Sequence, residues 1–346
     1  MSNSFRELLK KVGSGEHTSK NLTREEAKVA TKMMLLQEAT PAQIGAFMIA
    51  HRIKRPTPIE LAGMLDAYDE LGPKLELNHF KKTITVLGTP YDGRDRTAPV
   101  TPITALILAT VGIPVLMHGG DSFPTKHGLP LIQIWQGLGA DFSHLSLQQT
   151  QELLEKTGIG FIYLPKHFNL AQNLIPYRDQ IGKRPPFATV ELIWCPCIGN
   201  VHLVAGFVHP PTEERFQETL KLRGINNFTT IKGLEGSCDL SRSRTAIIGR
   251  VKNGNFERIL LNPRDYDFGE HDVPLDSPNQ LIEQLKDILA GKPGELRQSA
   301  IWNGGFYLWL FDICSDIKTG FSLAETMLKE GKVAEKLREV SSYLRK

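Results

Sequence analysis

The fold is decided by the stretch LTREEAKVATKMMLLQEATPAQIGAFMIAHRIKRPTPIELAGML, residues 22–65. Three threonines in it are each followed three residues later by an acid or an amide, and two of them directly by proline: Thr23 and Glu26, Thr40 with Pro41 and Gln43, and Thr57 with Pro58 and Glu60. This spacing is typical of a helix N-terminus, because the two side chains satisfy free backbone N–H groups and proline has none to satisfy. Apolar residues recur at helical spacing, Pro56 ends the second helix and Gly72 follows the third. The stretch therefore predicts a small unit of three short helices.

After residue 82 the pattern changes to that of strands. The β-branched run 83–87 ends before Gly88, residues 101–111 are expected to be helical, and the apolar run 113–117 ends before His118. This order of strand, loop, helix and strand is typical of a parallel α/β sheet with functional loops at the carboxyl ends of its strands. Further strands are expected at 160–164, 202–208, 228–232, 246–251 and 258–261, and helices at 147–156 and 213–223.

Helical signals return near the C-terminus. Ser277 with Gln280 predicts a capping box before a helix that ends at Gly291, and Ser322 with Glu325 predicts the start of a helix that ends at Gly331. We expect a helical domain over residues 1–75 and a larger α/β domain with a mainly parallel central sheet over residues 80–346. A segment near 165–190 is expected to pack on the helical domain. A ligand would then bind in the cleft between the two domains.

Composition excludes several protein classes. The 346 residues are 41% hydrophobic and 23% charged, which allows a large core and excludes a disordered or collagen-like chain. The 41 lysines and arginines exceed the 38 acids by only three, so the bulk charge indicates no partner. The longest nearly apolar run, 105–117, is shorter than the roughly 20 residues that a membrane span needs. We expect a soluble cytoplasmic protein with reduced thiols at its four cysteines.

The segment 22–65 and the order of the later segments resemble the anthranilate phosphoribosyltransferases and their nucleoside phosphorylase relatives. A Gly-Thr loop follows the first strand, a His-Gly loop the second, an arginine-bearing segment lies near 178 and a KGLEG segment near 235. The resemblance implies the nucleoside phosphorylase/phosphoribosyltransferase class IV fold. It implies transfer of phosphoribose from phosphoribosyl pyrophosphate (PRPP) to an aromatic or N-heterocyclic acceptor, with Mg²⁺ as cofactor. It also implies a homodimer formed through the N-terminal helices, where Met33, Met34, Phe47 and Met48 are compatible with an interface or with a core of the chain's own.

By this resemblance the first loop binds the donor phosphates. The residues that the resemblance assigns to this role are Gly88, Thr89, Asp92, Gly93 and Thr101. The family loop is usually Gly-Thr-Gly-Gly-Asp, and here Pro90 and Tyr91 replace two glycines, which removes an amide donor and adds bulk where backbone should approach phosphate. The segment is therefore either an anion site or a surface loop before a capped helix.

The second loop and the acidic segment depart further from the family pattern. Catalytic members have Lys-His-Gly-Asn, whereas residues 117–120 are Met-His-Gly-Gly, which keeps only His118, expected to be catalytic, and Gly119, expected at the donor phosphates. Lys126 or His127 would have to supply the missing cation. Glu235 is the metal ligand that remains of an adjacent acidic pair, because Gly236 replaces the second acid.

The acceptor-binding segment is closer to the family. Arg178 aligns with the arginine that pairs with the acceptor carboxylate, and Arg184 with a later family arginine. Arginine holds carboxylate or phosphate through two parallel hydrogen bonds. The resemblance therefore assigns acceptor binding to both residues and a catalytic role to Arg178.

A second function is also consistent with these losses. They are similar to those of the divergent YbiB-like branch of the family, whose members are dimers associated with nucleic-acid binding. Basic residues in a groove bind phosphate backbones without sequence preference. The alternative is a non-catalytic protein that binds single-stranded DNA or RNA, with further contacts from Arg94, Arg96, Lys183, Arg242 and Arg244.

Overall fold

The computed structural model describes residues 3–15 and 17–345. Its N-terminal part is a bundle of four helices: α1 (Asn3–Gly13), α2 (Arg24–Leu35), α3 (Pro41–Lys54) and α4 (Pro58–Leu71). The three predicted capping boxes are confirmed, since the side chains of Thr23, Thr40 and Thr57 each accept from the third helical N–H and the third side chain accepts in return. Helix α1 was not predicted, although its buried Phe5, Leu8 and Val12 have helical spacing.

The larger part of the chain is built on a seven-stranded sheet in the order β4-β3-β2-β6-β7-β8-β9. Its strands are β2 (Ile84–Gly88), β3 (Val115–Gly119), β4 (Ile159–Tyr163), β6 (Val201–Gly206), β7 (Phe228–Ile231), β8 (Ala246–Lys252) and β9 (Asn255–Leu261). The first five strands of that order are parallel, and β8 pairs antiparallel with both β7 and β9, so only β8 runs against the other strands. Two short strands, β1 (Leu75–Glu76) and β5 (Cys197–Ile198), pair separately. The predicted fold class is confirmed.

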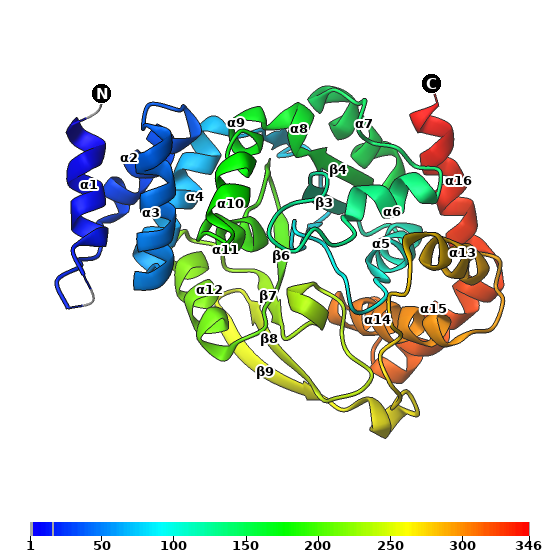
Figure 1. Ribbon diagram of the computed structural model, residues 1–346. Coiled ribbons are helices and arrows are strands. Elements are labelled where there is room, and N and C mark those ends of the chain that lie inside the picture. The colour runs from blue at the N-terminus through cyan, green and yellow to red at the C-terminus, as the bar shows by residue number, and fades with distance from the viewer. Residues whose placement is uncertain (1–2, 16, 346) are drawn as a thin grey trace.

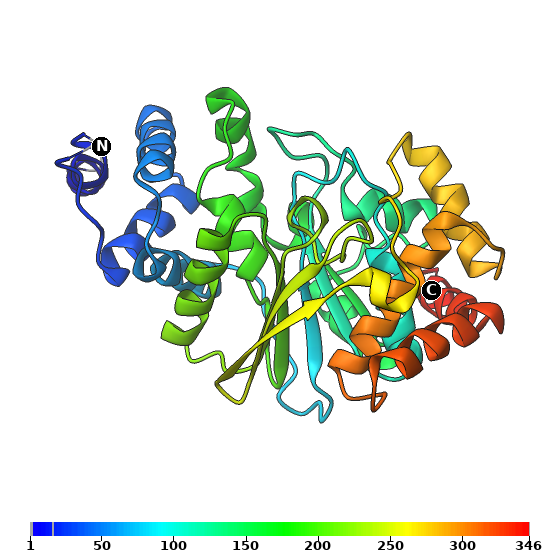
Figure 2. The same cartoon turned by 90° about the horizontal axis from the view of Figure 1, so that it is seen from below.

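Helices cover the sheet and separate its strands along the chain (Figure 1). The longer ones are α5 (Thr101–Thr110), α6 (Leu131–Gly137), α7 (Leu147–Thr157), α12 (Pro210–Leu222), α13 (Pro278–Leu289), α14 (Glu295–Leu310), α15 (Ile317–Lys329) and α16 (Lys332–Leu344). Figure 2 shows the N-terminal helices at one end of the sheet and the C-terminal helices at the other. None of the helices described is long and apolar enough to cross a membrane.

One C-terminal helix start and one capping box differ from the prediction. Helix α15 begins at Ile317 rather than after Ser322, because the Asp316 side chain accepts from the N–H of Thr319 at 2.9 Å and so caps the helix six residues earlier than expected. Ser277 does accept from the N–H of Gln280, but the Gln280 amide donates to Asp276, so the predicted capping box is only half formed.

The segment between β4 and β5 joins the bundle to the sheet. It contains the short helices α8 (Leu164–His167), α9 (Asn169–Gln172), α10 (Ile175–Ile181) and α11 (Phe187–Val190), and α10 contacts α3 while α11 contacts α4. Met33, Met34, Phe47 and Met48 are buried in the chain's own core. Dimerisation through the N-terminal helices stays a prediction.

The parallel strands place the loops that matter for function. Strands β2, β3 and β7 run in the same direction, so the loops after Gly88, Gly119 and Ile231 lie at one edge of the sheet. Gly88 is required there, because a Cβ atom on it would lie 2.0 Å from the carbonyl oxygen of Leu192. The absence of a side chain at Gly88 therefore allows the segment after α11 to pack against the end of β2.

Candidate functional site

A cleft of about 1,200 Å³ lies between the end of α3, the start of α12 and the loops that follow β2, β3 and β7. Seven basic and four acidic side chains line it: Arg52, Arg55, Arg96, Lys126, Arg178, Arg184 and Arg215, with Asp92, Asp95, Glu191 and Glu235. Basic groups outnumber acids, and a cleft concentrates their field. The cleft therefore suits an anionic ligand.

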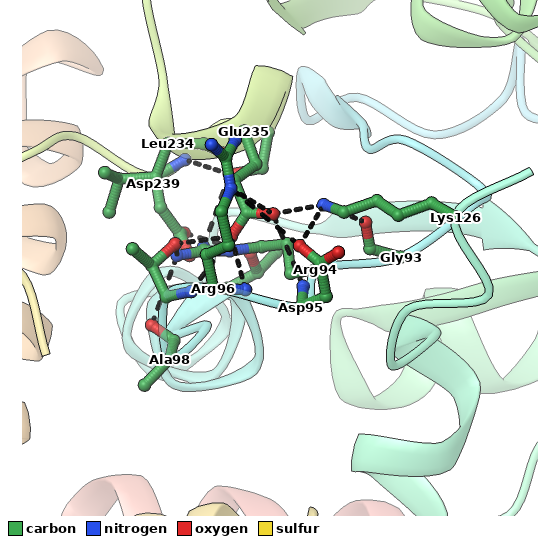
Figure 3. Close-up of polar contacts among 12 residues, drawn as sticks. Gly93, Arg94, Asp95, Arg96, Ala98, Lys126, Leu234, Glu235 and Asp239 are labelled. Carbon is green, nitrogen blue, oxygen red and sulfur yellow. Dashed lines mark hydrogen bonds and ion pairs between the residues drawn. The ribbon is translucent and has the colours of Figure 1, made fainter. Parts of the chain in front are cut away.

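Glu235 is the centre of a polar cluster on one wall of the cleft (Figure 3). Its carboxylate accepts from the Thr97 N–H at 2.9 Å, the Thr97 hydroxyl at 2.7 Å and the Arg96 N–H at 3.2 Å. The Lys126 ammonium forms a close ion pair with it. Although burial alone would raise the pKa of Glu235, the hydrogen bonds from Lys126 and Thr97 hold it well below its usual value. Glu235 is therefore an ionised carboxylate whose orientation is fixed.

A second buried carboxylate fixes the loop after β2. Asp239 accepts from Arg94 Nη1 at 2.5 Å, from the Val100 N–H at 3.0 Å and from the Thr101 hydroxyl at 2.9 Å. Arg94 is buried by this contact and also donates to the Thr97 hydroxyl. The loop is thus held by the chain's own charges, and the prediction that Arg94 contacts a nucleic acid is corrected, because its guanidinium is enclosed.

The predicted donor-binding residues lie at two neighbouring recesses and at the ends of two strands. Asp92 lines the main cleft, whereas Thr89, Gly93 and Thr101 border a separate recess of about 20 Å³. Gly88 and Gly119 are buried at the ends of their strands. Binding of the donor phosphates by these six residues stays a prediction.

His118 is enclosed rather than presented to the cleft. Its Nδ1 lies 2.6 Å from the Tyr91 hydroxyl oxygen, and its ring packs edge-on against Trp194. Tyr91 stands where the family loop has a glycine and lines the cleft itself. Burial lowers the pKa of His118 to about 4. A direct catalytic role for His118 is therefore not supported by its position.

The enclosed His118 predicts a pH dependence of stability. Because its folded pKa lies below the ordinary value of 6.5, the unfolded chain binds more protons between pH 6.5 and 4, and stability falls as the pH falls through that window. We expect His118→Gln to flatten the curve by about 1 kcal/mol per pH unit in urea unfolding between pH 7 and 5. The matched control is His79→Gln at an exposed histidine, and an unchanged slope in His118→Gln would contradict the assignment.

Arg178 is buried and already has a carboxylate partner. Its guanidinium forms a bidentate ion pair with Glu191, in which Nη1 lies 3.2 Å from Oε2 and Nη2 is in close contact with Oε1. Its guanidinium carbon also lies 5.3 Å from the centre of the Phe123 ring. The position predicted for an acceptor carboxylate is therefore filled by the chain's own Glu191.

Arg184 bridges the cleft. It reaches from the segment before α11 to Asp92 in the loop after β2, where the two side chains form a close ion pair. Burial raises the pKa of Asp92 above its usual value, and Arg184 opposes that effect. Arg184 keeps about half of its side chain exposed, so it can also contact a ligand.

Three arginines on the opposite wall have no carboxylate partner among the residues that the structure describes. Arg52 and Arg55 end α3, and Arg215 lies in the first turns of α12, where it donates to the Pro211 carbonyl oxygen at 2.9 Å. Burial lowers the pKa of Arg215, and the positive charge of Arg55 lowers it further. We call Arg52, Arg55 and Arg215 the arginine wall. Like charges held close favour binding of an anion.

The other predicted nucleic-acid contacts do not converge on one surface. Arg96 is exposed at the cleft, and Lys183 is exposed beside Arg184. Arg242 is buried elsewhere, where it donates to the carbonyl oxygens of Phe268 and Glu295, and exposed Arg244 lies outside the cleft. Glu191 and the arginine wall were not predicted. The basic run in HRIKRP, residues 51–56, is the local signal that points to Arg52 and Arg55.

Comparison with known protein families gives matches over most of the chain. Residues 6–72 match the model of the glycosyl transferase family, helical bundle domain, and residues 81–334 match that of the glycosyl transferase family, a/b domain. Curated relatives include the anthranilate phosphoribosyltransferases of Acetivibrio thermocellus, 28% identical and covering 97% of this chain and 96% of the relative, and of Verminephrobacter eiseniae, 24% identical and covering 89% and 90%.

Solved structures show the same fold. Anthranilate phosphoribosyltransferase from Thermus thermophilus has a TM-score of 0.79 at 22% identity and covers 98% of this chain and 99% of that one. The enzyme from Saccharomyces cerevisiae, in complex with PRPP and Mg, has a TM-score of 0.86 at 15% identity and covers 100% and 99%.

Proposed function

The chain belongs to the glycosyl transferase family whose helical bundle and a/b domains it contains, and from this premise we propose that its cleft binds PRPP and transfers phosphoribose to an aromatic or N-heterocyclic acceptor. One observation carries the proposal. The loops after β2, β3 and β7 bring Asp92, Lys126 and Glu235 to a single basic cleft beside the helical bundle. A pyrophosphate leaving group needs such positive charge near it.

The acceptor differs from that of the curated relatives in this proposal. Arg178 is saturated by Glu191, so an acceptor carboxylate would have to displace a buried carboxylate of the chain itself. An acceptor without a carboxylate avoids this competition. We therefore favour a neutral aromatic amine or N-heterocycle over anthranilate.

The chain's own cations would act on the donor. Arg96, Lys126 and Arg184 border the cleft and are available to neutralise charge on pyrophosphate oxygens as the anomeric bond breaks. The described residues contain no group of three or more His, Cys, Asp and Glu side chains that could hold a metal. The carboxylates of Asp95 and Glu235 and the carbonyl oxygen of Gly93 do surround one position, which the Lys126 ammonium occupies. These oxygens would hold Mg²⁺. When bound, Mg²⁺ would neutralise phosphate oxygens.

Pyrophosphate release tests this function. The protein is incubated with PRPP, Mg²⁺ and a panel of acceptors that pairs anthranilate with carboxylate-free amines and N-heterocycles. We expect release with a carboxylate-free acceptor and a rate about 100-fold lower in Arg184→Gln, because a charge at the leaving group is lost. Arg338→Gln, on the exposed face of α16, is the matched control. Absence of release with every acceptor would contradict catalysis.

The arginine wall favours a second candidate function, binding of single-stranded nucleic acid. Its three arginines line a cleft of about 1,200 Å³, and a basic groove is how proteins follow the backbone of a single strand. The test is fluorescence anisotropy of a labelled oligonucleotide at increasing salt. Substitution of Arg52, Arg55 and Arg215 by Gln together should reduce the salt slope by about 2, at about 0.7 per lost contact on a single strand. Arg338→Gln should leave it unchanged, and absence of binding at low salt would exclude this function.

A further inference from the structure

The Lys126 ammonium occupies a cage of oxygen atoms. Its Nζ lies 3.0 Å from Asp95 Oδ1 and 3.2 Å from the Gly93 carbonyl oxygen, and it is in close contact with Glu235 Oε2. The oxygens come from the loops after β2 and β7, and the ammonium from the loop after β3 (Figure 3). Only 15% of the Lys126 side chain is exposed. Three separate loops therefore meet at one enclosed cation.

The chemistry of this cage suits a divalent cation as well as an ammonium. Two carboxylates and a backbone carbonyl are the oxygen ligands that Mg²⁺ and Mn²⁺ prefer. An ammonium carries three N–H donors, and the three oxygens use all of them. Glu235 cannot turn away to accept a metal elsewhere, because Thr97 holds its other oxygen through an N–H and a hydroxyl. Lys126 and a metal ion therefore compete for the same oxygens.

We propose that Lys126 holds the metal position in the ligand-free protein, so that a divalent cation enters the cleft only when this ammonium leaves the cage. The inference rests on the proposed function, because the phosphorylated ligand supplies the anion to which the displaced ammonium moves. Metal and ligand then bind together, and metal alone is excluded. Lys126, together with the Arg96 guanidinium that lies 3.6 Å from Glu235 and 3.8 Å from Asp95, thus keeps the two carboxylates neutralised while the cleft is empty.

Binding of Mn²⁺ in the absence of any phosphate tests the proposal, with free Mn²⁺ measured by electron paramagnetic resonance. We expect the unmodified protein to bind weakly and Lys126→Met to bind at least about tenfold more tightly, because a positive charge about 3 Å from the oxygens is removed. Lys126→Arg, which keeps the charge, should bind as weakly as the unmodified protein. The double variant Lys126→Met with Glu235→Gln should lose the gain, because one carboxylate of the cage is neutralised.

Two outcomes would overturn the proposal. If the unmodified protein binds Mn²⁺ as tightly as Lys126→Met, the ammonium does not exclude metal. If neither binds it, the oxygens are not a metal cage. Mn²⁺ binding to the unmodified protein can be measured whether or not the variants fold. Thermal unfolding of each variant checks that it is native. Failure of the proposed function is seen separately, as absence of PRPP binding in the presence of Mg²⁺.

Discussion

Replacing Glu191 by alanine is expected to destabilise the protein by about 3–5 kcal/mol, because it leaves the buried Arg178 guanidinium without its counter-charge. Both side chains are almost fully enclosed, so the guanidinium would keep little contact with solvent to replace the lost carboxylate. Urea unfolding measures the change. The pair also links α10 to the end of α11, which places the segment that lines the cleft.

The double variant Arg178→Met with Glu191→Leu separates a buried charge from a general loss of packing. Removing both charges should restore much of the stability, since apolar side chains of similar volume often replace a buried ion pair without loss. Asp312→Ala, at an exposed pair with Lys252, is the matched control and should cost at most about 1 kcal/mol. A loss in Glu191→Ala no larger than in this control would contradict the account of the pair.

Asp239→Ala is expected to cost about as much, again about 3–5 kcal/mol, because Asp239 is the buried partner of Arg94. It also removes the acceptor for the Val100 N–H and the Thr101 hydroxyl, which hold the start of α5. The loop after β2 should then become susceptible to limited proteolysis between residues 93 and 101.

Asp316→Ala provides the control for that variant. Asp316 also accepts from an N–H and a hydroxyl, but as an exposed helix cap, and its loss should cost only about 1 kcal/mol. Equal losses in the two variants, or an unchanged cleavage pattern in Asp239→Ala, would show that Asp239 does not organise the loop.

The fold was predictable where its signals are local. The threonine caps at 23, 40 and 57 depend on residues three positions away, and each is confirmed. The strand boundaries differ from those expected by at most three residues, and the starts of β7 and β8 and the end of β9 match. Where a competing local signal existed, the prediction failed: Asp316 caps α15, although Ser322 and Glu325 have the same spacing as a capping box.

The site was less predictable, because its partners are distant in the sequence. Glu235 was predicted to be a metal ligand, but its ion pair with Lys126 joins residues that are 109 positions apart in the sequence. The enclosure of Arg94 by Asp239 spans 145 positions. The pairing of Arg178 with Glu191 is closer in sequence, yet nothing in residues 178–191 shows that both side chains turn inward. Residue type indicated which groups carry charge, and only the packing decides which charges remain free.

The central claim is that this cleft binds PRPP. Calorimetric titration of the protein with PRPP and Mg²⁺ tests it most directly, with Arg184→Gln and the exposed Arg338→Gln as a matched pair of variants. We predict saturable binding of one PRPP per chain that is weakened in Arg184→Gln and unchanged in Arg338→Gln. No heat of binding at millimolar PRPP, or binding that both variants retain equally, would contradict the claim.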